Sequence, residues 1–324
     1  MNQLSITTYK VCLIFLGAAF YTYYGIYKML FIHPELIGSD FHKGYFAALN
    51  FLNNLPIYTM PEHINPYLYP PLTVLLFVPF TLFSIETATT LWFFLCHAII
   101  IFSAYIVYGF GRENGRLDSA VAVITCFGFS MPMQGLLLTG NINIIIFLGI
   151  SVAYMFFLSR NRYLTPLSLA FCNFIKFFPS ILVLLFLRRK YYFMFFIFII
   201  SSILLGVFSV ILFGWNIHNI FINQFAQASR YITIFHSMSF THVIMLITPW
   251  ISACVNIAFN ILFGIIMLGL WYKISRISKN EIGSQAQSDI VDFFVLSIVM
   301  VTLFPSSWIF YNAFFIFPFY FMKI

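Results

Sequence analysis

The chain has 324 residues, of which 62% are hydrophobic and only 8% are charged, and its mean hydropathy is +0.96. A soluble domain carries roughly a quarter charged residues, so this composition excludes an ordinary water-facing surface. The net charge of +7 does not indicate nucleic-acid binding, because the basic residues are spread over short connections instead of one patch. The composition predicts an all-α polytopic membrane protein, a single transmembrane domain over residues 1–324 that lies in the lipid bilayer.

Apolar stretches divide the chain into about ten predicted transmembrane helices, with no inserted soluble domain and no internal repeat. The first stretch follows Lys10 as a signal peptide would, but no small-residue cleavage site ends it, so it is predicted to be retained. One later stretch, 163–187, is read as a single span that is interrupted around Phe174–Pro179. The predicted spans lie near residues 11–31, 70–85, 91–110, 119–137, 141–158, 163–187, 191–213, 243–272, 290–304 and 308–322.

Two long polar connections, residues 32–69 and 214–241, separate these spans. The triplet Arg188-Arg189-Lys190 is expected on the cytoplasmic side, because cytoplasmic loops are enriched in Lys and Arg. The span 191–213 then carries the chain outward, so the connection 214–241 is expected outside. A short, nearly uncharged N-terminus followed by one span places the connection 32–69 outside as well. The same path leaves Arg112 with Arg116, and Arg160 with Arg162, on the outer side, against the positive-inside rule.

Side chains capable of chemistry are concentrated in the two outer loops, which together with His242, directly after the second loop, contain six of the seven histidines. This concentration predicts an active or binding site at the outer boundary of the membrane, with the first loop, 32–69, as the catalytic one. Polar candidates for contact with a substrate in these loops are His42, Lys43 and His236, while Arg230 suits a phosphate or a lipid headgroup.

Asp40 lies just beyond the first span and has two interpretations. Its carboxylate is suited to act as a general base toward a hydroxyl group. An Asp before an apolar run is also a common N-cap, here for a helix expected from Phe41 to Asn53. The two roles are compatible.

Lys176 stands in the middle of an apolar run, where a cation is costly and by default indicates function. A compact ammonium charge suits a phosphate. The alternative is that the long side chain reaches the membrane surface, which a break at Pro179 would make easier. The sequence leaves these two interpretations balanced.

Three further segments contain candidate substrate-binding residues. Tyr69 begins a Tyr-Pro-Pro-Leu turn, Asn141 and Asn143 place two amides between apolar stretches, and Trp308 follows a Pro-Ser-Ser break. Each also has a structural interpretation as an interfacial aromatic, a helix cap or an interhelical bond. No P-loop, GxSxG, HExxH or DxD motif is present, so the sequence indicates no cofactor and no metal ligands, although a divalent metal stays open.

In their order and spacing, four segments resemble glycosyltransferase family 87, the polyprenol-phosphate-mannose-dependent mannosyltransferases of the GT-C superfamily. The departures are that Asn141 replaces a Gln, Phe177 replaces a Pro, and no His follows Trp308. The matching segments are Asp40-Phe41 with the turn that leads to Tyr69-Pro70-Pro71-Leu72, Gly140-Asn141-Ile142-Asn143, Lys176 with Pro179 and Arg188-Arg189-Lys190, and Pro305-Ser306-Ser307-Trp308.

The resemblance implies a GT-C-type fold with an outer-face active site and an inverting transfer without a sugar nucleotide. A hexose, with mannose the expected sugar, would pass from a polyprenyl-phosphate donor to a glycan or glycolipid hydroxyl at a bacterial inner (cell) membrane. The resemblance implies that Asp40 is the base and that Lys176 meets the donor phosphate. Alternatives are an O-antigen-type polymerase, which should have outer loops rich in Arg, and a non-enzymatic transporter or flippase, which should have repeated halves.

Overall fold

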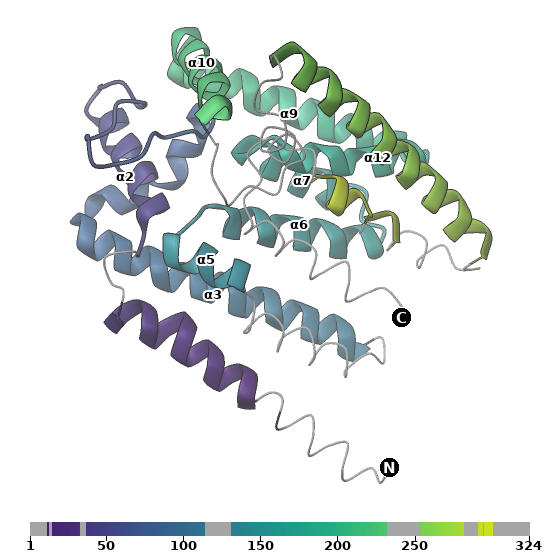
Figure 1. Cartoon of the computed structure of the whole chain (residues 1–324), viewed down its shortest axis with the longest axis horizontal. Helices are drawn as coiled ribbons and strands as arrows, with labels where there is room; N and C mark the ends of the chain where they lie inside the picture. The colour runs from purple at the N-terminus through teal and green to yellow at the C-terminus, as the bar shows by residue number, and fades with distance from the viewer. Residues whose placement is uncertain are drawn as a thin grey trace. The chain divides into compact units, whose positions relative to one another are not determined.

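The computed structural model describes residues 12, 15–32, 37–113, 131–231, 253–281, 291–293 and 295–300. Within these ranges every regular element is a helix and none is a strand. Figure 1 shows these helices with their labels. The chain divides into two compact units. Unit 1 comprises Met1–Tyr67 with Val74–Leu148, and unit 2 comprises Leu68–Thr73 with Gly149–Ile324. The all-helical class predicted from the sequence is confirmed for this part of the chain.

Unit 1 is built around helix α2, which covers Ser39–Leu52, and the long helix α3, which covers Ile85–Glu113. Its other elements are the helical segment η1 (Tyr21–Ile32), the 3-10 helix η4 (Val78–Leu82), helix α5 (Met131–Thr139) and the start of α6 (Asn143–Leu158). A second 3-10 helix, η3 (Pro71–Leu76), begins in the short segment that belongs to unit 2.

The predicted span 70–85 is wrong as a continuous membrane helix, because this stretch forms the two short 3-10 helices η3 and η4. Prolines explain the break. Pro70 and Pro71 stand at the start of η3, and Pro79 near the start of η4, where each removes a backbone donor and restricts the preceding residue.

An aromatic cluster around the buried Trp92 of α3 forms the core of unit 1. The Trp92 ring lies 5.1 Å from the ring of Phe41, 5.1 Å from that of Phe77 and 5.2 Å from that of Phe80. Gly44 of α2 faces Phe77 so closely that a Cβ there would lie 2.4 Å from the ring. The cluster therefore fixes the N-terminal half of α2, which carries Asp40, against α3 and η4.

Unit 2 contains the long helix α9, which covers Tyr192–Phe213 and packs along α7, which covers Leu164–Ile175. The other elements are the remainder of α6, the 3-10 helix η5 (Phe178–Val183), and the helices α8 (Leu184–Arg188), α10 (Trp215–Tyr231) and α12 (Ala253–Glu281). Residues 214–231 of the predicted second outer loop are thus mostly helical.

The segment 163–187 is interrupted where predicted, but its prediction as a single span is wrong. Helix α7 ends at Ile175, Lys176 is extended (φ −151°, ψ 141°), and the chain returns through η5 and α8. The two ends of the segment meet, because the Arg160 guanidinium donates to the Tyr191 hydroxyl and the rings of Phe157 and Tyr191 lie 6.1 Å apart. Residues 164–188 therefore form a hairpin with Lys176 near its tip.

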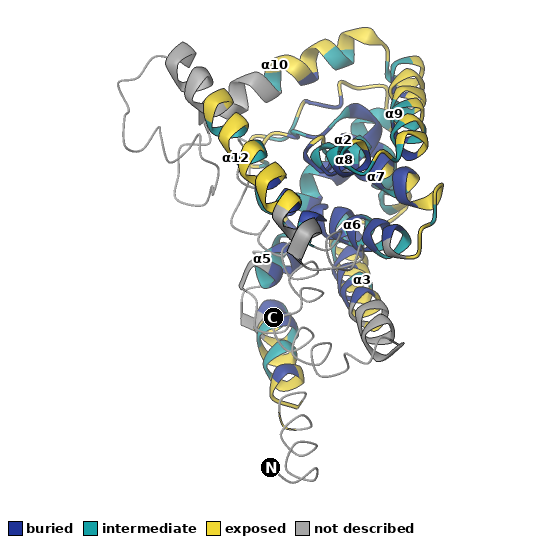
Figure 2. Cartoon of the chain, turned by 90° about the vertical axis from the view of Figure 1, so that its right-hand side faces the viewer, coloured by how far each residue is buried: buried dark blue, intermediate teal, exposed yellow. Residues whose placement is uncertain are grey.

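Two helices of the described residues are long and apolar enough to cross a membrane, by length and composition: Ile85–Ser103 within α3, and α9. Among the residues of α9, only Met194, Phe198 and Ser209 are buried. The rest of α9 is largely exposed or half-buried, as the yellow and teal ribbon in Figure 2 shows, although it consists almost entirely of apolar side chains. This exposed apolar surface is unusual for a helix in water.

Candidate active site

Asp40 is the second residue of α2, and the residue at the N-cap position is Gly38. Asp40 therefore lies inside the first turn of α2, and its interpretation as the helix N-cap is wrong. Gly38 adopts φ +78° and donates its backbone N–H to the Leu138 carbonyl at 2.9 Å. The turn before α2 is thereby tied to the end of α5, and the Asp40 carboxylate is left to bind other groups.

Two side chains hold the Asp40 carboxylate, one on each oxygen. Lys43 Nζ donates to Oδ1 at 2.6 Å, and Asn141 Nδ2 donates to Oδ2 at 2.5 Å. The side chains of Asp40 and Lys43 are each 17% exposed, so the pair is mostly shielded and still reaches solvent. Charge-assisted bonds of this kind orient a carboxylate while leaving lone pairs for a further proton.

Asn141 is itself fixed by the turn that begins α6. Its Oδ1 accepts the backbone N–H of Asn143 at 3.0 Å, which leaves the amide nitrogen aimed at Asp40. The preceding Gly140 has φ +62°, and its carbonyl accepts the indole N–H of Trp92 at 2.8 Å. A Cβ on Gly140 would lie 3.0 Å from Trp92 Cδ1 and 3.2 Å from Phe41 Cβ, so this position favours glycine both sterically and conformationally.

His42 and Asn143, two other predicted binding residues, do not contact the Asp40 carboxylate through any described hydrogen bond. His42 Nε2 lies 3.0 Å from Thr89 Oγ1, which in turn donates to the Ile85 carbonyl at 2.6 Å. Burial is the main cause that lowers the pKa of His42, and the Glu86 carboxylate opposes it. A neutral imidazole that donates from Nε2 fits this arrangement, and it fastens α2 to α3.

Asn143 is completely buried, and neither atom of its side-chain amide has a hydrogen-bond partner among the described residues. A buried amide costs free energy unless it is satisfied by hydrogen bonds, so such a group calls for an explanation.

The aromatic pair Tyr58 and Tyr67 lies in the same unit, with ring centroids 5.7 Å apart, and burial raises the pKa of both phenols.

In unit 2, Lys176 lies near the tip of the hairpin and places its ammonium 4.9 Å from the centroid of the buried Tyr69 ring. This cation–π contact unites two of the predicted residues. Helix α7 rises about 18 Å over its 12 residues, so Lys176 stands well away from the basic connections at the ends of the hairpin. The side chain is half-buried, which argues against the interpretation that it simply extends to the membrane surface.

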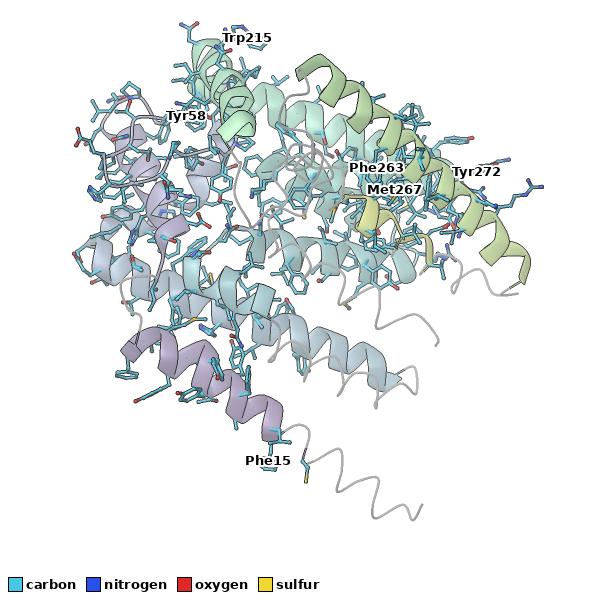
Figure 3. The ribbon with its side chains drawn as sticks, viewed as in Figure 1. Phe15, Tyr58, Trp215, Phe263, Met267 and Tyr272 are labelled. Atoms are coloured by element: carbon cyan, nitrogen blue, oxygen red, sulfur yellow. The ribbon has the colours of Figure 1, made fainter. Side chains whose placement is uncertain are left out.

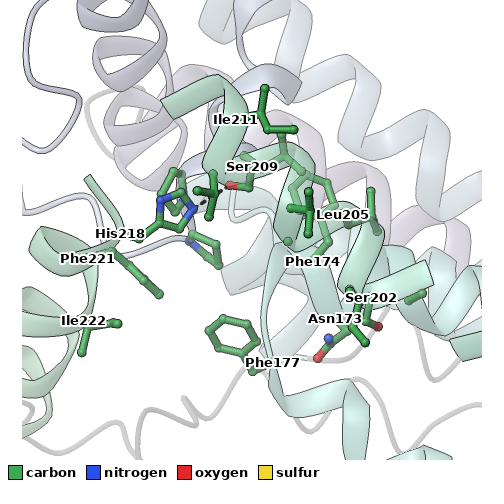
Figure 4. A pocket seen from close by; sticks show the side chains of 18 residues that line it. Asn173, Phe174, Phe177, Ser202, Leu205, Ser209, Ile211, His218, Phe221 and Ile222 are labelled. Carbon is green, nitrogen blue, oxygen red and sulfur yellow. Dashed lines mark hydrogen bonds between the residues drawn. The ribbon is translucent and has the colours of Figure 1, made fainter. Parts of the chain in front are cut away.

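An apolar cavity of about 530 Å³ opens in unit 2 among η3, α7, α9 and α10. Figure 4 shows Asn173 and Ser202 at one end of it, and Ser209 bonded to His218 at the other, at 2.9 Å. Phe177, the neighbour of Lys176, lines the cavity together with Phe174, Phe221, Pro70, Pro71 and several aliphatic residues of α9. The volume is that of a typical small-ligand site, and its lining suits a hydrocarbon chain.

The sequence did not single out Trp92, Gly38 or Asn173. An amide inside an apolar run was a signal for Asn173, whereas the contacts of Trp92 depend on the tertiary structure. Of the remaining predicted residues, His236 and Trp308 lie outside the described residues, and the side chain of Arg230 is not described. Among the described residues, no three His, Cys, Asp or Glu side chains gather in a group that could hold a metal ion.

The described residues thus form helices alone, with an oriented carboxylate in unit 1 and, in unit 2, a cation next to a residue that lines an apolar cavity. Comparison with protein-family models gives a match to glycosyltransferase family 87 over residues 67–306. The match spans well over half of the chain, so the chain belongs to glycosyltransferase family 87, which indicates a glycosyltransferase. Asp40 and Trp308 lie outside the matched residues. No curated protein and no solved structure matches the chain.

Proposed function

We propose that this protein is an integral membrane glycosyltransferase that moves a hexose, with mannose the expected sugar, from a polyprenyl phosphate to a hydroxyl of an envelope glycan or glycolipid. Membership of family 87 supports the transfer of a sugar. The observation that carries the proposal is the Asp40 carboxylate, which Lys43 and Asn141 orient from two sides while it remains in reach of solvent.

The apolar exterior of α9 supports residence in a membrane. Its 22 residues rise about 33 Å, close to the thickness of a bilayer core. Phe196, Leu204 and Ile211 are each at least 60% exposed, and an aqueous surface would not favour such a row. Tyr192 and Trp215 flank the helix at its two ends, where aromatic side chains favour the membrane–water boundary.

The hairpin also supports a revised membrane topology. Without a crossing at 70–85 or at 164–188, we infer three crossings between the first outer loop and Arg188, which are α3, the span predicted from the sequence at 119–137, and α6. With three crossings, Arg112, Arg116, Arg160, Arg162 and the Arg188-Arg189-Lys190 triplet would all lie in the cytoplasm, in agreement with the positive-inside rule. This topology would remove the conflict with the positive-inside rule, and residues 38–69 and Gly140-Asn141 would face outward.

Asp40 would act as the general base in an inverting displacement. As the acceptor oxygen bonds to the anomeric carbon, Asp40 takes the hydroxyl proton, and the bond from that carbon to the phosphate oxygen breaks with its electron pair leaving on the phosphate. The Asn141 amide and the Lys43 ammonium hold the carboxylate in the geometry that this proton transfer needs.

Lys176 would stabilise the departing phosphate, because a fixed cation in a site shielded from water strongly favours developing negative charge. The Tyr69 ring restrains the ammonium before the donor binds. The apolar cavity beside Phe177 would take the polyprenyl chain. Backbone that is not helical at membrane depth is tolerated where it lines a cavity, which fits the extended residue at the tip of the hairpin.

The test is transfer from a labelled polyprenyl-phosphate mannose by the purified full chain in lipid nanodiscs. Asp40→Asn should lower the rate by about 10²–10⁴-fold, the usual contribution of a general base. Glu62→Gln is the matched control, since Glu62 is an exposed acid of the same loop, and it should keep wild-type activity. Retention of activity by folded Asp40→Asn protein would remove Asp40 from the mechanism, and donor binding without any turnover in the wild type would favour a transporter.

A further inference from the structure

A second cavity, also of about 530 Å³, lies in unit 2 at the opposite end of α9 from Trp215. Three cationic side chains line it, those of Arg160, Arg162 and Lys190, and none of its described lining residues is acidic. Its walls are otherwise apolar or aromatic. They consist of Phe157, Tyr191, Tyr192, Phe193 and Met194.

The loops that carry the cations are held in fixed conformations. Arg160 and Lys190 both adopt left-handed backbone conformations, with φ +59° and +58°, which are uncommon outside glycine and tend to mark functional sites. Asn161 Oδ1 accepts the backbone N–H groups of Tyr163 at 3.1 Å and Leu164 at 2.9 Å, so it fixes the start of α7. The Arg160 guanidinium donates to the Tyr191 hydroxyl across the mouth of the hairpin.

The other two cations of the basic triplet are occupied elsewhere. Arg189 donates to the buried Asp292 carboxylate at 2.6 Å. The Arg188 guanidinium lies 4.8 Å from the centroid of the Tyr272 ring, which projects from α12 (Figure 3). Lys190 alone of the three lines the second cavity, so its charge joins those of Arg160 and Arg162 instead of balancing an acid there.

The first turn of α9 adds to the positive potential. The helix begins at Tyr192 without a side-chain cap, so the first backbone N–H groups and the positive end of the helix dipole face this end of the unit. Helix N-termini of this kind favour anions, and the planar guanidinium of arginine can bind two oxygens of a phosphate group at once. The cavity is therefore built for a phosphate group.

We propose that this cavity binds the phosphate headgroup of an anionic phospholipid from the cytoplasmic leaflet. A lipid fits better than a soluble phosphate, because the apolar exterior of α9 begins at the cavity itself. Phe193 lines the cavity and is 51% exposed, and Phe196 follows one turn later at 60% exposed. Acyl chains can thus lie along α9 while the headgroup meets the cations, as in other basic pockets at the cytoplasmic surface of membrane proteins.

The test measures the affinity of a fluorescent phosphatidylglycerol for the purified full chain in neutral detergent. The pocket variant Arg162→Gln/Lys190→Gln removes two cations, and each should contribute about fivefold to affinity, so binding should weaken about 25-fold. The matched control Lys273→Gln/Arg276→Gln removes the same charges from exposed positions on α12 that do not line the cavity. It should bind within about twofold of the wild type.

If both double variants lose the same lipid affinity, the lipid is attracted by the general positive charge of the surface and not by this cavity, and the proposal is overturned. Displacement of the lipid by inorganic phosphate at equal concentration would also overturn it, because the ligand would then be a soluble anion. A fluorescent phosphatidylcholine should bind equally weakly to all three proteins. Because the measurement involves no glycosyl transfer, its outcome is independent of the roles proposed for Asp40 and Lys176.

Discussion

Asn141→Asp is the substitution that most directly probes the proposed base. It is isosteric, and its Oδ1 can still accept the Asn143 N–H that shapes the start of α6. It also exchanges an amide donor for a second carboxylate at the hydrogen-bond distance of 2.5 Å from Asp40. Two carboxylates at such a distance share one proton over a wide pH range, as like charges disfavour double ionisation.

The size of the effect follows from the Coulomb energy. Two unit charges about 4 Å apart repel by about 4 kcal/mol at an effective dielectric constant of 20, which corresponds to roughly three pH units at most. The nearby Lys43 ammonium and the partial exposure of the pair reduce this repulsion. The acid limb of the profile of kcat/KM against pH should therefore move upward by about 1–2 units.

The direction of the shift in the pH profile follows from the role of Asp40 as a base, which must be ionised to accept a proton. A shared proton blocks the carboxylate, so the variant should lose activity in the range of about 1–2 pH units above the acid limb of the wild type and should recover it as pH rises further. Asn65→Asp adds the same charge at an exposed position of unit 1 and should leave the profile unchanged. The reasoning fails if Asn141→Asp keeps the wild-type profile, or if its activity is lost equally at every pH while the protein stays folded.

Three further outcomes are expected. Gly140→Ala should lower the free energy of unfolding by about 1–3 kcal/mol, because φ +62° and the contact with Trp92 both disfavour a Cβ. The control Gly206→Ala should be neutral or stabilising, since nothing lies within 4 Å of its Cβ. Apparent Tm values of the two variants in detergent measure the difference. Gly149→Ala would place its Cβ 2.4 Å from Cys172 Sγ, so it should lower the free energy of unfolding by about 1–3 kcal/mol. In a double-mutant cycle, adding Cys172→Ala to the same chain should restore much of that loss. Lys176→Met should slow transfer by about 10²-fold or more and weaken binding of a polyprenyl phosphate. An unchanged rate would show that Lys176 does not stabilise the leaving phosphate.

The hairpin of residues 164–188 connects structure with the proposed chemistry. In a continuous membrane-spanning helix over residues 163–187, Lys176 would lie in the middle of the span, where an ammonium ion is costly. The extended backbone at Lys176 and the return through η5 instead keep the ammonium against the Tyr69 ring. The same fold brings Arg160 to Tyr191, which creates the basic cavity at the other end of the unit. One reversal of the chain thus produces both features.

Local sequence patterns were sufficient for several of the helices and for one break between them. The long apolar run of α9, the break around Lys176 and the helix after Gly38 were all predictable, because hydrophobicity and proline act on neighbouring residues. The run from Pro70 to Ile85 was misjudged, because its hydropathy resembles that of a span while its prolines favour short 3-10 turns.

The sequence by itself determined that the chain is helical, that it is too apolar for an aqueous surface, and that Asp40 and Lys176 deserve a chemical role. Only the tertiary structure decided what each side chain meets. Asn141 stands 101 residues from Asp40, and Arg160 stands 31 from Tyr191, yet each pair is joined by a hydrogen bond. Such pairings depend on how the chain turns at Gly140 and Lys176, and a turn of the backbone redirects whole helices. Local periodicity carries no information about that direction.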